Sequence, residues 1–457
     1  MTNFKNIFLE DSKIAFDKKH RKTINFNISR YDESVAKGKL RYSNLDLAKQ
    51  RASYIKDKVV ANLANYIEEF EKNALKNNIQ IIWARNSKEA VAEIIKVLKE
   101  NNAHLIVKSK SMISEEIDLN ENLEKTGFEP VETDLGEFIV QVAGEKPYHI
   151  LTPAMHKSKE DVARLFNEKF NTPPHSSPLE ITLFVREKLR KKFTAAEVGI
   201  TGANFLIADI GGIALTENEG NGFMSVAFPK VHIVISGIEK LLPSVNDLPL
   251  FFPLLSAHGT GQQVTVYNSL LTGPKKAGET NGPEKMIVVL LDNNRTKIAA
   301  EKEHFKALKC IRCGACLNAC PIYKNVGGYT FGSTYTGPIG SVITPFFNGF
   351  GKYNHLSYAC SVCGACSEVC PVKIPLHDLL LLNRKKSVEK NLGTFSWNAG
   401  MKAYEWAFKK RKNLDFVNGT LKNQLVKTNK NIFGKEKEFP LFAKKSFSET
   451  WKLNLKP

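Results

Sequence analysis

Cysteine is absent from most of this chain of 457 residues. None occurs before Cys310 or after Cys370, so all eight lie within one short stretch. This distribution excludes a disulfide framework spread over the fold, and no cysteine outside this stretch is available as a catalytic nucleophile. The composition, with 42% hydrophobic and 25% charged residues, is that of a globular protein with more than one core.

Long hydrophobic runs are also lacking. No apolar run approaches the ~18 residues that a membrane span needs. The longest runs, at 205–215 and 231–238, are short and predict buried strands. Residues 1–16 have neither the apolar stretch nor the small-residue cleavage site of a signal peptide. We therefore expect a cytoplasmic protein whose contact with a membrane would be peripheral.

Nucleotide-binding fingerprints are missing as well. Gly259-Thr260-Gly261 is not followed by a third glycine or a predicted helix, and no Walker A motif occurs. The sequence therefore predicts no flavin or NAD site. Hydride chemistry, which such cofactors carry, is expected on another subunit.

The eight cysteines form two copies of one motif, each of which reads C-x2-C-x2-C-x3-C-P. CIRCGACLNACP at 310–321 is repeated as CSVCGACSEVCP at 360–371, including the central Gly-Ala pair. Thiolates bind iron well, and a [4Fe–4S] cluster needs four of them around a compact core. A zinc ribbon would instead place two C-x2-C pairs about 15–20 residues apart.

In two-cluster ferredoxins, the fourth cysteine of each motif ligates the other cluster. The sequence therefore predicts two [4Fe–4S] clusters, one on Cys310, Cys313, Cys316 and Cys370, and one on Cys360, Cys363, Cys366 and Cys320. Two segments between the motifs, 327–328 and 335–340, are rich in glycine. We expect them to cover the clusters from water rather than to dock a partner.

Hydrophobic periodicity predicts an α/β domain between residues 70 and 300, preceded by helix and followed by a mostly helical cluster region. The expected helices are at 44–75, 88–101, 114–125, 159–170, 179–192, 304–308 and 376–386. The expected strands are at 104–107, 138–142, 231–236 and 286–291, with two more within 203–217 joined at Gly211-Gly212.

Positive charge is concentrated at the C-terminal end. Residues 384–457 hold 18 Lys/Arg and 6 Asp/Glu, so +12 of the net charge of +18 lies there. Lysines alternate with aromatic residues, which are Trp397, Tyr404, Trp406 and Phe408. Such a face suits a partner protein or a membrane surface, whereas nucleic acid is the less expected partner.

Four further residues are candidates for a small-molecule pocket. His149 and His156 flank Pro153, although two ordinary surface histidines would look the same. Glu217 and Glu219 follow a predicted strand, where ligand sites of α/β domains often lie, and a polar turn is the alternative.

The order of these parts resembles the lactate-utilization iron–sulfur proteins of the LutB/YkgF type. The likeness covers nearly the whole chain and is carried by HILTPAMH at 149–156, TGANFLIADIGGIALTENEGN at 201–221, YTGPIGSVITP at 335–345 and the two cysteine motifs. It implies a LUD domain, related in fold to sugar-phosphate isomerases and CoA-transferases (NagB/RpiA/CoA-transferase-like). The implied organisation is a helical region at 1–69, the LUD domain at 70–300, the two-cluster domain at 301–390 and a basic region at 391–457.

The resemblance also implies a role as electron-transfer subunit in the oxidation of L-lactate to pyruvate, without catalysis by this chain alone. A cysteine-rich subunit and a smaller LUD subunit are the implied partners. Two other functions remain open: electron transfer for a different 2-hydroxy acid, and an iron–sulfur regulator that binds nucleic acid.

Overall fold

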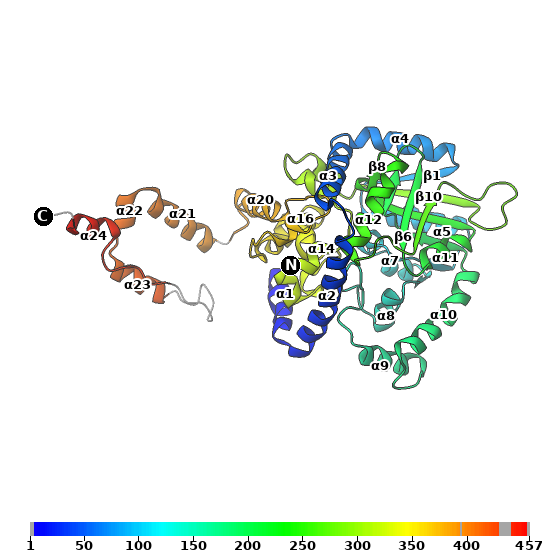
Figure 1. Cartoon of the computed structure of the whole chain (residues 1–457), viewed down its shortest axis with the longest axis horizontal. Helices are drawn as coiled ribbons and strands as arrows, with labels where there is room; N and C mark the ends of the chain where they lie inside the picture. Colours follow the sequence, from blue (N-terminus) through cyan, green and yellow to red (C-terminus); the bar gives the residue numbers. More distant parts are fainter. Residues whose placement is uncertain (1–3, 394, 429–439, 455–457) are drawn as a thin grey trace. The chain divides into compact units, whose positions relative to one another are not determined.

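The computed structural model describes residues 4–393, 395–428 and 440–454 (Figure 1). The chain forms two compact units, Met1–Lys385 and Lys386–Pro457. The first unit holds the predicted helical region, the α/β domain and both cysteine motifs. The predicted basic region at 391–457 falls in the second unit, and its residues 394, 429–439 and 455–457 lie outside the described part of the chain.

A six-stranded parallel sheet forms the centre of the first unit, with strand order β1-β10-β7-β4-β2-β3. Its strands are β1 Ile79–Ala84, β2 Leu105–Lys108, β3 Glu129–Glu132, β4 Val198–Thr201, β7 Val231–Gly237 and β10 Lys285–Leu291. Side chains of β10 alternate between two cores. Val288 packs on one face with helices α3 (Leu45–Ala61) and α4 (Leu63–Lys76), and Val289 packs on the other with α5 (Ser87–Glu100) and α7 (Leu119–Lys125). Burial of both faces explains the continuous apolar runs.

A second sheet of four strands, in the order β8-β5-β6-β9, lies beside the first. Its strands are β5 Phe205–Ile207, β6 Gly212–Glu217, β8 Leu241–Leu242 and β9 Tyr267–Leu271. Strands β5 and β6 are joined at Gly211-Gly212, as predicted, and the structure shows that they are antiparallel. Gly211 has a φ of 58°, and a Cβ there would lie 2.1 Å from the backbone nitrogen of Ala74, so only glycine fits.

Helices surround both sheets (Figure 1). Those of the N-terminal region are α1 Phe4–Asp11, α2 Lys18–Lys39, α3 Leu45–Ala61 and α4 Leu63–Lys76. Those of the α/β domain are α5 Ser87–Glu100, α6 Met112–Glu116, α7 Leu119–Lys125, α8 Leu135–Ala143, α9 Lys159–Phe170, α10 Pro178–Ala195, α11 Asn221–Ala227, α12 Leu248–Gly259 and α13 Arg295–Ala299. The helix predicted after Ser158 begins there with a capping box.

The cysteine region is mostly helical, as predicted. Its helices are α14 Ala315–Ala319, α15 Pro321–Val326, α16 Gly337–Asn348, α17 Phe350–Tyr353, α18 His355–Tyr358, α19 Ala365–Glu368 and α20 Leu376–Glu389. The helix predicted at 304–308 is a 3-10 helix over His304–Lys309. The second unit continues as α21 Phe395–Lys409, α22 Arg411–Asp415, α23 Gly419–Thr428 and α24 Phe447–Asn454.

Three predicted elements differ from the structure. The strand predicted at 138–142 is wrong: these residues belong to helix α8, whose N-cap Asp134 accepts from the Glu137 N–H. A short apolar run does not distinguish a buried helix from a strand. The helix predicted at 114–125 breaks at Asp118, which has a φ of 48°. The helix predicted at 44–75 is interrupted at Asn62.

Candidate functional site

The structure brings the cysteines together in two sets of four. One small cavity is lined by Cys310, Cys313 and Cys316 of the first motif together with Cys370 of the second. Another is lined by Cys360, Cys363 and Cys366 together with Cys320. Each cavity therefore takes three cysteines from one motif and the last cysteine from the other.

Helix α16 begins between the two cavities. Pro338 lines the cavity at Cys320, and the next residue, Ile339, lines the cavity at Cys316. Both residues are buried. The expectation that segment 335–340 covers the cysteines is therefore confirmed. In segment 327–328, a Cβ on Gly328 would lie 1.8 Å from the carbonyl oxygen of Tyr148, so this turn also packs inward.

The two motifs share an unusual backbone. The residue before the second cysteine of each motif has a positive φ, which is 60° at Arg312 and 56° at Val362. Few L-residues adopt this conformation, and a β-branched valine does so at a cost. The turn directs the Arg312 N–H to the Cys310 Sγ at 3.4 Å and the Val362 N–H to the Cys360 Sγ at 3.3 Å. Such N–H donors stabilise metal-bound sulfur.

The chemistry of each set fits an iron–sulfur cluster. Burial raises the pKa of Cys370 to about 11 and that of Cys366 to about 12, so without a metal these thiols would keep their protons. Iron takes the place of those protons, because thiolates are its ligands in [4Fe–4S] clusters. Four sulfurs around one cavity, with N–H donors behind them, supply the ligand set that a cluster needs.

The two sets differ in exposure. Cys313, Cys316 and Cys370 are buried, and their cavity also includes Ile150 of the α/β domain. In the other set, Cys363 is exposed and Cys360 is half-buried. The second set is therefore the one that solvent or another protein can approach.

The two candidate histidines have structural partners. His149 is 2% exposed, so the alternative of an ordinary surface histidine is wrong for it. Its Nδ1 accepts from the Leu151 N–H at 3.1 Å, and its Nε2–H donates to the Asn318 Oδ1 at 3.1 Å. Burial lowers the pKa of His149 to about 3, so the ring is neutral and joins the α/β domain to α14. His156 hydrogen-bonds Glu145 at 2.7 Å and stacks on Tyr148.

Glu217 and Glu219 line a larger cavity of about 260 Å³. Glu217 accepts from the backbone N–H groups of Gly222 and Phe223 at 2.6 and 2.7 Å. The histidines do not line this cavity, so the four candidates do not form one pocket. Instead, Arg312 of the first cysteine motif reaches into it, together with Lys240 and Glu239, which follow strand β7.

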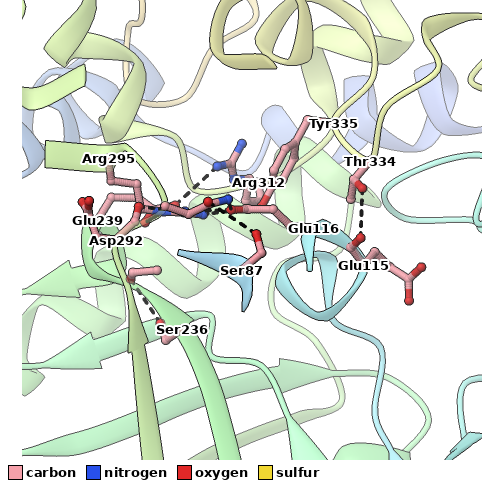
Figure 2. Close-up of polar contacts among 12 residues, drawn as sticks. Ser87, Glu115, Glu116, Ser236, Glu239, Asp292, Arg295, Arg312, Thr334 and Tyr335 are labelled. Atoms are coloured by element: carbon pink, nitrogen blue, oxygen red, sulfur yellow. Dashed lines mark hydrogen bonds and ion pairs between the residues drawn. The ribbon is translucent and has the colours of Figure 1, made fainter. Parts of the chain in front are cut away.

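A buried charge network joins this cavity to the cysteine region, and Figure 2 shows its members. Arg295 forms a bidentate pair with Glu116, at 2.9 and 2.7 Å, and donates from Nε to Glu239 at 2.5 Å. Tyr335 donates to Glu116 at 2.5 Å, and the guanidinium of Arg312 lies 4.2 Å from the centre of the Tyr335 ring. Burial alone would raise the pKa of Glu239, but Arg295 and Arg312 outweigh it and hold the pKa at about 2.

A second cluster of buried charged groups includes Lys108 of strand β2. Glu115, Glu132 and Glu137 bring carboxylate oxygens within 4.8 Å of one another. Lys108 is their counter-ion, with its Nζ 2.7 Å from Glu132 and 3.4 Å from Glu115. Burial and then the charge of Glu132 raise the pKa of Glu137 well above 4.5. One lysine thus faces three carboxyl groups, an arrangement that favours the protonated form of Glu137.

Replacement of Glu137 by glutamine is expected to stabilise the protein increasingly as the pH rises. A carboxyl with a raised folded pKa keeps its proton in the fold but loses it in the unfolded chain above its ordinary pKa. The parent protein therefore loses stability as the pH rises from 4.5. Glutamine does not titrate. The difference in melting temperature between Glu137→Gln and the parent should therefore be greater at pH 8 than at pH 5.5, by about 2 °C or more in favour of the variant.

The exposed Glu68→Gln is the matched control for thermal unfolding at the two pH values. The melting temperature of Glu68→Gln should differ from that of the parent by the same amount at both pH values. An equal difference for Glu137→Gln at pH 5.5 and pH 8 would contradict a protonated Glu137.

Comparison with known families identifies two parts of the chain. The family model of the LUD domain matches residues 67–291, and that of a 4Fe-4S dicluster domain matches residues 306–374. The chain is thus a LUD protein with a dicluster domain, and it carries two [4Fe–4S] clusters as predicted. Among the described residues, no helix is long and apolar enough to cross a bilayer.

Curated relatives narrow the family. Lactate utilization protein B of Bacillus licheniformis is 43% identical over 382 residues, which cover 81% of this chain and 80% of the relative. Lactate utilization protein B of Bacillus subtilis is 42% identical over 401 residues, 85% of this chain and 84% of that protein. The uncharacterized electron transport protein YkgF of Escherichia coli is 40% identical over 359 residues, 79% and 75% of the two chains. The chain belongs to the lactate utilization protein B family.

Proposed function

We propose that this chain is the iron–sulfur electron-transfer subunit of a complex that oxidises L-lactate to pyruvate and so allows lactate to serve as a carbon and energy source. The observation that carries the proposal is the pair of cavities, each lined by four cysteines drawn from both motifs. The relatives named for lactate utilization and electron transport support the substrate and the role.

The cluster ligands are part of the proposal. Cys310, Cys313, Cys316 and Cys370 hold one cluster, and Cys360, Cys363, Cys366 and Cys320 hold the other. When bound, the clusters supply single-electron transfer. The protein contributes the N–H donors to sulfur, the cover of α16 and a difference in exposure between the two sets.

The proposed partners would supply the cofactor site for which the sequence has no fingerprint. The sequence has no dinucleotide fingerprint, so the two-electron chemistry of a hydroxy acid belongs to another subunit. We propose a cysteine-rich subunit and a smaller LUD subunit as partners, in the cytoplasm. Exposed Cys363 favours a partner contact beside the second cysteine set.

The purified holoprotein alone is expected to show no lactate-dependent reduction of a dye, because its sequence has no fingerprint for a cofactor that carries hydride. Co-expression with the two proposed partner subunits should yield a complex that reduces the dye with L-lactate. The measurement is anaerobic dye reduction by each preparation at equal iron content. Turnover by the chain alone would contradict the division of labour.

Two other functions have separate tests. Growth of a deletion strain on a panel of 2-hydroxy acids distinguishes lactate from a different substrate. A regulator that binds nucleic acid has some support in helix α21, where Trp397 and Trp406 are each more than half exposed among lysines. Salt-sensitive binding of duplex DNA by the holoprotein would favour this function.

A further inference from the structure

The cavity of about 260 Å³ lies where the α/β domain meets the first cysteine motif. Its walls include Glu217 at the end of β6, Ser236 and Gly237 at the end of β7, and Arg312 between Cys310 and Cys313. In parallel α/β sheets, ligands bind beyond the carboxyl ends of the strands. The cavity has the size of a small metabolite and adjoins the residues that hold the first cluster.

Arg312 brings a hydrogen-bond donor that has no acceptor. Its side chain is 9% exposed, and its Nη1 is buried without a partner among the described residues. Nη2 makes only a long contact of 3.4 Å to Glu239, whose other oxygen is already bound by Arg295 at 2.5 Å. An unsatisfied buried donor on a charged group costs free energy, so its presence calls for an acceptor. Arg312 lines both this cavity and the cavity of the first cysteine set, and the larger cavity has room for a ligand that supplies the acceptor.

Lys240 adds a second cation to the same wall. Burial lowers its pKa to about 8, and Arg312 adds to this effect, so the ammonium is still mainly protonated at neutral pH. Within the described residues, its Nζ forms no ion pair with a carboxylate. The charges of Arg295, Glu116 and Glu239 are largely committed to one another. Lys110 also lines the cavity, and its Nζ donates to the carbonyl oxygen of Leu151 at 2.7 Å. Arg312 and Lys240 are therefore the cations of the wall with the fewest partners.

Acceptors lie elsewhere on the wall. Glu219 has a pKa raised by burial and by the charge of Asp134, which also lines the cavity. Glu217 points its carboxylate at the same region and accepts two backbone N–H bonds there. A ligand with an anionic group and a hydroxyl group would satisfy both the cations and these carboxyl groups.

We propose that this cavity binds a small organic carboxylate, with the carboxylate on Arg312 Nη1 and Lys240 Nζ and a hydroxyl toward Glu217 and Glu219. This site goes beyond electron transfer, since binding needs neither partner subunits nor turnover. Because Arg312 lies between two cluster ligands, the bound anion places negative charge beside the first cluster. By reciprocity, the ligand and an added electron then weaken each other's binding.

The test uses the full-length holoprotein, purified anaerobically, and isothermal titration with L-lactate, pyruvate and inorganic phosphate as probes. L-lactate is expected to bind, and Lys240→Gln and Arg312→Gln are each expected to weaken binding tenfold or more. The control Lys22→Gln changes an exposed lysine of α2 and should leave the affinity unchanged. Absence of carboxylate binding, binding of phosphate alone, or equal affinities in all variants would overturn the site.

A redox titration separates this site from the electron-transfer role. Saturating L-lactate should lower the midpoint potential of one cluster in the parent protein, by about 59 mV for each tenfold loss of affinity on reduction. The shift should vanish in Lys240→Gln at unchanged iron content. If Arg312→Gln changes the potential while every variant binds L-lactate equally, Arg312 serves the cluster alone and the proposal fails.

Discussion

Serine in place of Cys320 is expected to remove the cluster held by Cys360, Cys363 and Cys366, although Cys320 is far from these residues in sequence. The physical reason is the shared cavity, since Cys320 lines the same space as the second set. Iron should fall from about eight toward about four per chain, and the remaining cluster should lose its spin interaction with a neighbour. Cys370→Ser is the matched variant and should remove the other cluster.

Exposed Cys363 reports which cluster is lost. In the native Cys320→Ser protein, Cys363 should become open to alkylation, because no metal protects its sulfur. In Cys370→Ser it should stay protected while iron falls by the same amount. The reverse result, with Cys363 labelled only in Cys370→Ser, would show that each motif holds its own cluster.

The second large effect is expected from Arg295→Met. Arg295 is fully buried and pairs with Glu116 and Glu239, which are also buried. Methionine fills the space but leaves Glu116 without its cation and Glu239 with only the 3.4 Å contact to Arg312. Loss of one partner of a buried pair costs about 3–5 kcal/mol. Urea unfolding of the holoprotein under anaerobic conditions measures this loss.

Two controls separate charge from packing. Arg85 pairs with Glu89 at the surface, so Arg85→Met should leave the urea midpoint unchanged. Adding Glu116→Gln to Arg295→Met should recover part of the lost stability, because the uncompensated charge of Glu116 is then removed while Glu239 keeps Arg312 as a counter-ion. A loss for Arg295→Met as small as that for Arg85→Met would contradict a stabilising role for the buried network.

Local patterns in the sequence were enough to predict the cofactor and the main strands. The cysteine spacing determines cluster chemistry within a few residues. The apolar runs of β7 and β10 are short and continuous, which is typical of buried strands. Strand β3 was not predicted because it holds Pro130 and two glutamates. Helix α8 was mistaken for a strand because its central residues are apolar on every side.

The charge network was not predicted, and of the cavity only Glu217 and Glu219 were candidates, because the other residues come from separate segments. Glu116, Glu239 and Arg295 come from three separate segments of the α/β domain, and Arg312 joins them only when the cysteine region packs on that domain. One signal was available: Arg312 is a charged residue inside a cluster-binding loop, where a buried cation needs a partner. His149 was misread for a related reason, since its partner Asn318 lies in α14 and no local pattern connects them.

Metal analysis of the anaerobically purified chain, combined with low-temperature EPR of the reduced protein, tests the central claim most directly. We expect about eight irons and eight sulfides per chain, with signals of two interacting [4Fe–4S] clusters. Zinc in place of iron, or a protein without metal that keeps its fold, would contradict an electron-transfer subunit.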